Sequence, residues 1–166
     1  MKTIKLIIIT LLFSTTLISQ GFQVPTSYSF TTDADFQKHE NTIHECAVWL
    51  MANPVNLDIQ KRKNATKFLI DYVTASPQVA VELNGELTPF VTNQDFMVIF
   101  IASWTKSCLS QNYVNNKQEF TVRATEDVIA FYKANKKNLK KTKKIKKFVK
   151  LQQDGLLESH FAELMK

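Results

Sequence analysis

The segment HENTIHEC, residues 39–46, gathers two histidines, two glutamates and a cysteine, which are residue types that bind zinc. A zincin helix needs two histidines four residues apart, with a glutamate directly after the first. His39 and His44 are five apart, roughly 140° around an α-helix, so both cannot face one ion. Glu40 and His44 do share a face, but two ligands make a weak site. The pattern therefore predicts no metal site.

Cys46 and Cys108 are the only cysteines, and an even number in an exported chain favours a disulfide. Closing a loop of about 62 residues would stabilise the fold by roughly 4 kcal/mol. Both cysteines also adjoin apolar helical stretches, where a free thiol behaves as a small buried hydrophobe. The sequence leaves a Cys46–Cys108 disulfide and two buried thiols as open alternatives. No local motif places a histidine to activate either thiol.

Motifs of common catalytic sites are missing from the sequence. It contains no G-x-S-x-G elbow, no Walker loop and no dinucleotide fingerprint. We therefore expect no catalytic residues and no cofactor. An unrecognised hydrolase would need His39, His44 or His160 beside a carboxylate or cysteine in a cleft.

A lysine-rich stretch, KKNLKKTKKIKKFVK at residues 136–150, is the other candidate site, because a dense positive charge can bind a polyanion. On a helical wheel its apolar residues share one side, with most lysines on the other. We expect an amphipathic helix over 136–153. The candidate polyanion-binding residues are Lys136, Lys137, Lys140, Lys143, Lys144, Lys146, Lys147 and Lys150.

Repulsion among lysines at i,i+4 spacing costs roughly 1 to 2 kcal/mol, which something must offset. Docking of Leu139, Ile145, Phe148 and Val149 on other helices would do so. The body of the chain could also contribute a favourable field, because residues 22–132 carry eight Lys/Arg and twelve Asp/Glu. An anionic lipid, polysaccharide or nucleic acid is the third possibility. The first two need no partner, which favours a solvated face over a binding face.

The elements that position these residues follow an N-terminal segment typical of a signal peptide. Lys2 and Lys5 precede an apolar run that is too short for a comfortable membrane span, and we expect cleavage near residue 21. A retained anchor is the alternative. We expect residues 22–166 to form one domain of an exported protein, with no transmembrane span.

Helical spacing of apolar residues predicts an all-α, bundle-like domain of five to six helices. We expect helices over 35–51, from about 58 to before Pro77, over 94–109, over 117–134, over 136–153 and over 156–165. The third, with almost no polar face over two turns, should be the central one. Between the second and third, Asn84-Gly85 favours either a small β-hairpin near 79–88 or an extended loop.

Four segments, KNATKFLIDYV, FIASWTKSCLSQNY, FYKANKKNLKK and FVKLQQDGLLE, carry a resemblance to small, exported, helical bacterial proteins of uncharacterised function. The resemblance implies a bacterial periplasmic or secreted setting and brings no site residue with it. We expect a non-catalytic protein that acts through protein or envelope contacts. The alternative is a weak, salt-sensitive polyanion-binding module that uses the lysine-rich helix.

Overall fold

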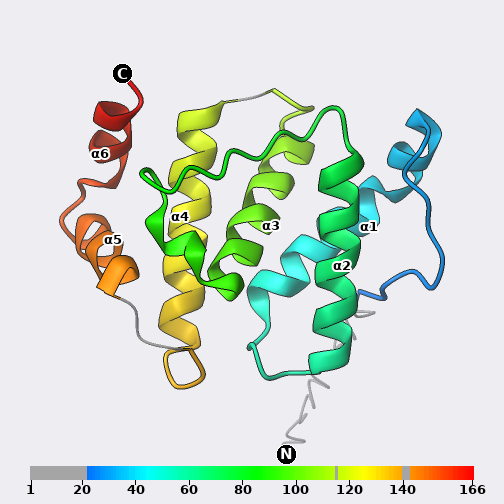
Figure 1. Cartoon of the computed structure of the whole chain (residues 1–166), viewed down its shortest axis with the longest axis horizontal. Coiled ribbons are helices and arrows are strands. Elements are labelled where there is room, and N and C mark those ends of the chain that lie inside the picture. The colour runs from blue at the N-terminus through cyan, green and yellow to red at the C-terminus, as the bar shows by residue number, and fades with distance from the viewer. Residues whose placement is uncertain (1–21, 115, 140–142) are drawn as a thin grey trace, which may run out of the picture.

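The computed structural model describes residues 22–114, 116–139 and 143–166. These residues form six α-helices and one short 3₁₀ helix and contain no strand, so the predicted all-α class is confirmed. The elements are α1 (Asp33–Ala52), α2 (Ile59–Ala75), η1 (Pro89–Thr92), α3 (Gln94–Ser110), α4 (Lys117–Ala134), α5 (Lys143–Gln153) and α6 (Leu157–Leu164). Figure 1 shows α3 and α4 in the middle, with α1 and α2 on one side and α5 and α6 on the other.

Helix α3 forms the centre of the core, and 11 of its 17 residues are buried. It packs against α1 and α4. Asn93 caps its start by accepting a hydrogen bond from the backbone N–H of Phe96 at 3.2 Å. Trp104 is fully buried and packs edge-on against Phe120 of α4, with ring centroids 5.7 Å apart. The prediction that this helix is the central one is confirmed.

The first two helices also begin and end where the sequence indicates. A capping box starts α1: Thr32 accepts from the N–H of Asp35, and the Asp35 carboxylate accepts from the N–H of Thr32. Asp58 caps α2 by accepting from the N–H of Lys61 at 3.0 Å. Neither helix continues to the prolines that follow at 54 and 77, as expected for a residue that excludes helical geometry before it.

The segment that follows α2 forms the extended loop of the two alternatives, not the β-hairpin. Asn84 organises a turn, since its side-chain oxygen accepts from the N–H of Glu86 and its carbonyl accepts from the N–H of Thr88. Val79 is buried, whereas Leu83 is 46% exposed. The start of the loop is therefore anchored in the core. Within the described residues, no strand pairs with this segment.

The lysine-rich helix begins later than the sequence predicts. Residues 135–138 form a turn, and α5 starts at Lys143 instead of Lys136. Asn135 ends α4: its side chain donates to the carbonyl of Phe131 and accepts from the N–H of Val55 at 3.0 Å. These bonds tie the end of α4 to the loop after α1, which turns the chain away from the helix axis. The predicted helical residues 140–142 lie outside the described residues.

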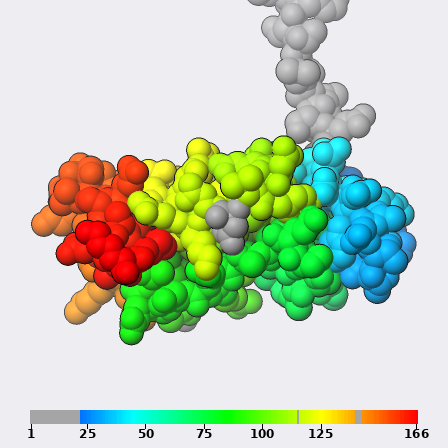
Figure 2. Space-filling view, turned by 90° about the horizontal axis from the view of Figure 1, so that it is seen from above, coloured from blue at the N-terminus to red at the C-terminus, as the bar shows by residue number. Residues whose placement is uncertain are grey.

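Gly155 ends α5 and sets the angle between α5 and α6. Its φ of 69° is left-handed, and the N–H of Leu156 donates to the carbonyl of Leu151 at 2.8 Å, as in a Schellman motif. Gly155 is therefore the left-handed residue that follows the end of α5. Together α5 and α6 make up one end of the molecule, opposite the segment that begins at residue 22 (Figure 2).

The predicted signal peptide, residues 1–21, lies outside the described residues. Within the described ranges, no helix combines the length and the hydropathy needed to cross a bilayer.

Candidate functional site: the lysine face of α5

Helix α5 docks on the rest of the protein through a narrow apolar stripe. Ile145 and Phe148 are buried, and Val149 is half-buried. The Phe148 ring packs edge-on against Phe90 of η1 at 4.9 Å and stacks with Phe161 of α6 at 5.9 Å. Burial of two such side chains contributes about 3 to 6 kcal/mol, which exceeds the expected repulsion among the lysines. The prediction that the apolar side docks inward is confirmed.

The opposite side of α5 is a continuous positive surface. We call it the lysine face, and it consists of Lys143, Lys144, Lys146, Lys147 and Lys150, all of which are exposed. At 100° per residue these positions cover roughly 160° of the helix surface. Five of the eight lysines proposed from the sequence thus lie on one face of one helix.

The lysine face lacks carboxylate partners in the described structure. The four ion pairs among the described residues are Lys67–Asp71, Lys106–Asp127, Lys117–Glu82 and Arg123–Glu119, none of which involves α5. Lys144 donates a long hydrogen bond, 3.4 Å, to the Thr92 hydroxyl, and the Lys147 ammonium lies 5.8 Å from the centre of the Phe148 ring. Within the described residues, no ion pair with a carboxylate neutralises these charges.

The remaining candidate lysines lie elsewhere. Lys136 and Lys137 are exposed in the turn after α4, and Lys140 lies outside the described residues. Lys133, which the sequence did not single out, joins α4 to α5 by donating to the side-chain oxygen of Gln152 at 2.9 Å. The end of α4 is therefore close to the end of α5.

The two cysteines are free and buried, and no disulfide joins them. Cys46 donates a hydrogen bond through its sulfur to the carbonyl of Ala65 at 3.3 Å, between α1 and α2. Burial raises the pKa of its thiol to about 12 and that of Cys108 to about 11. Of the two alternatives open from the sequence, the structure has the buried thiols. Neither thiol is ionised near neutral pH.

The three histidines are far from equivalent. His39 is buried edge-on against Phe30 and Phe68, so its ring is part of the core. His160 packs against Phe148, and its pKa is lowered by partial burial and secondarily by Lys147, with Glu163 opposing. His44 is half-buried on α1. Among the described residues, no group of three or more His, Cys, Asp or Glu side chains could hold a metal ion.

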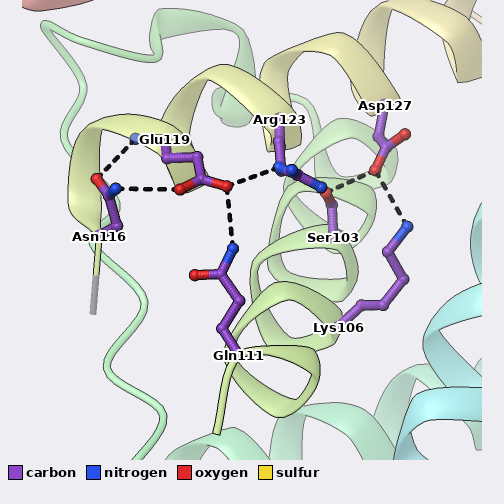
Figure 3. Close-up of polar contacts among 7 residues, drawn as sticks. All are labelled: Ser103, Lys106, Gln111, Asn116, Glu119, Arg123 and Asp127. Carbon is purple, nitrogen blue, oxygen red and sulfur yellow. Dashed lines mark hydrogen bonds and ion pairs between the residues drawn. The ribbon is translucent and has the colours of Figure 1, made fainter. Parts of the chain in front are cut away.

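A polar groove at the start of α4 was not recognised from the sequence. Its volume is about 760 Å³, and we call it the acidic groove because four of its lining residues are acidic and two are basic. Figure 3 shows its two pairings: Asp127 accepts from Ser103 and faces Lys106, while Glu119 accepts from Gln111 and Arg123. The full lining is Lys106, Ser107, Asn116, Gln118, Glu119, Val122, Arg123, Glu126, Asp127 and Glu158.

A second groove, of about 470 Å³, lies between α2 and the start of α3, with Ile59, Ile70 and Val98 in its lining. Arg62 at its edge donates to the carbonyls of Leu50 and Asn53 and so satisfies the end of α1. Arg62 is half-buried, whereas the neighbouring Lys63 is exposed. Neither groove, nor a shallower hollow beside Tyr28, has a histidine in its lining.

Comparisons with protein-family models, with curated proteins and with solved structures found no match to this chain.

Proposed function

We propose that this protein is an exported, non-catalytic protein that acts by contact, and that the lysine face of α5 binds an anionic polymer of the cell envelope or its surroundings. One observation carries the proposal. Five exposed lysines share one face of a docked helix, and none of them pairs with a carboxylate of the described residues. The proposed export is based on the N-terminal segment, whose charge and apolar run are those of a signal peptide.

The energetics of α5 favour an external anion. Lys143 and Lys147, and also Lys146 and Lys150, are like charges at i,i+4 spacing, and each such pair costs a few tenths of a kcal/mol. The apolar stripe offsets this cost and keeps the helix docked, but it leaves the charges in place. A polyanion that lies along the helix would remove the repulsion and release its own counterions.

The side chains on α5 favour a polysaccharide over a membrane or a nucleic acid. Ile145 and Phe148 are buried in the protein, so they are not available as anchors in a bilayer. The lysine face has no arginine for forked phosphate contacts and no exposed aromatic ring for base stacking. Lysine ammonium groups are compact charges on flexible side chains, and they suit a flexible polymer with carboxylate or sulfate groups.

Heparin affinity chromatography tests the proposal, with heparin as a model sulfated polysaccharide. The variant carries four reversals on the lysine face: Lys143→Glu, Lys144→Glu, Lys146→Glu and Lys147→Glu. A matched control carries the same net change at four exposed lysines outside α5: Lys38→Glu, Lys63→Glu, Lys117→Glu and Lys166→Glu. We expect the wild type to be retained and released by salt, the α5 variant to flow through, and the control to stay retained.

Equal loss of retention in the two variants would show that heparin binding depends on net charge alone, and this result would contradict the proposal. Parallel binding measurements with vesicles of anionic lipid and with a single-stranded DNA identify which class of polyanion the protein prefers. Tighter binding to either than to heparin would contradict the polysaccharide assignment.

A further inference from the structure

The acidic groove carries more negative charge than its own cations neutralise. Lys106 lies 3.8 Å from Asp127, and Arg123 lies 3.1 Å from Glu119. Glu126 and Glu158, the other two carboxylates of the lining, are exposed and pair with no cation of the described residues. The groove is therefore a concave surface with a net charge of about −2, which suits a positively charged partner.

The acidic groove lies next to the helices on which α5 docks. It is lined mainly from α4, with Lys106 and Ser107 of α3 and Glu158 of α6. Helix α5 packs against α4 and α6, and α5 and α6 form one edge of the protein (Figures 1 and 2). Within one molecule the lysines of α5 do not reach the carboxylates of the groove, since no ion pair joins them.

We propose that the lysine face of one molecule docks in the acidic groove of a second copy of this chain. The charges are complementary, and both surfaces are exposed. The face is convex, on a helix of 11 residues that is about 16 Å long. A two-fold axis would let each molecule place its α5 in the groove of the other. Such a contact closes into a dimer and does not propagate into a fibre.

This dimer bears on the proposed function because it would use the same lysine face. A polysaccharide and a second copy compete for α5, so the polymer would separate the dimer into bound monomers. The competition is the part of the inference that rests on the proposed function. The dimer itself is tested without any polymer.

Charge exchange between two variants tests the contact. The first variant has the four reversals on the lysine face, and the second has Glu126→Lys and Glu158→Lys in the groove. We expect the wild type to double its apparent mass in sedimentation equilibrium at about 0.01 M salt, where the Debye length is about 30 Å, and to be monomeric at about 1 M. Each variant alone should stay monomeric, and an equal mixture should form a heterodimer, because the reversed surfaces again complement each other.

A wild type that stays monomeric at low salt and high protein concentration overturns the inference, even if heparin is retained. Dimers that persist in the groove variant alone overturn it too, since another surface must then hold them. If the two variants form a heterodimer and the wild type does not bind heparin, the proposed contact is supported and the proposed function is contradicted. Dimers that heparin dissociates support both.

Discussion

The thiols of Cys46 and Cys108 are protected by the core and not by a bond between them. Both side chains are buried, and burial raises the pKa of each well above neutral. We predict that neither thiol of the native protein reacts with a colorimetric disulfide reagent near pH 8, because only the thiolate attacks. After unfolding in denaturant without reductant, both thiols should react. No reaction after unfolding would mean that the protein carries a disulfide.

Asp35 shows how one capping residue connects stability to pH. Hydrogen bonds from the backbone of Thr31 and Thr32 lower the pKa of its carboxyl to about 2, from an ordinary value of 3.8. Because the folded pKa is the lower one, the contribution is complete above the ordinary pKa and is lost as pH falls toward about 2. Asp35→Asn should flatten this part of the stability profile in urea unfolding between those pH values. Parallel profiles for the two proteins would contradict the assignment.

At the scale of the elements, Phe148 is the residue that holds α5 on the protein. It contacts both η1 and α6 through its ring. We predict that Phe148→Ala lowers the free energy of unfolding by about 3 to 5 kcal/mol. It should also increase hydrogen exchange in α5 before the other helices. Leu164→Ala, at an exposed apolar site on α6, is the control and should change stability by less than about 0.5 kcal/mol.

Equal effects of the two substitutions would show that α5 does not dock through Phe148. A large loss of stability from Phe148→Ala with no change in the exchange of α5 would place its contribution elsewhere in the core.

Element boundaries were predictable where a local signal marks them. Asn93 and Asn116 cap α3 and α4, and the predicted range of α4, residues 117–134, is confirmed. The predicted start of α5 was wrong because Asn135 turns the chain there. Asn135 accepts a hydrogen bond from the N–H of Val55, which is 80 residues away in sequence. No periodicity in the lysine stretch reports such a contact. For the same reason, Asn84-Gly85 indicated a turn correctly but could not show whether two strands would pair.

At the scale of the whole molecule, the packing of the helices forms the acidic groove, which could be predicted from the sequence only in part. Glu119 and Arg123 are at i,i+4 spacing on one helix, a pair that inspection could have found. Ser103 and Lys106 meet Asp127 only because α3 packs on α4, and Glu158 comes from α6. The uneven charge of the chain was evident from its composition. The acidic groove depends on the packing of α3, α4 and α6, and the basic face depends on the docking of α5.

The central claim is that the charges of the lysine face bind a polyanion directly, and the salt dependence of binding tests it most directly. The dissociation constant for a heparin oligosaccharide of defined length would be measured by calorimetry over a range of salt concentrations. Counterion release, by the rule for nucleic acids, makes the association constant, which is the inverse of the dissociation constant, fall with salt with a log–log slope of about −0.7 to −0.9 for each lysine that contacts the polymer. With all five lysines of the lysine face in contact, we predict a slope of about −3.5 to −4.5 for the wild type. The variant with four reversals in α5 should have a slope near zero. A wild-type slope near zero, or the same slope in both proteins, would contradict the claim.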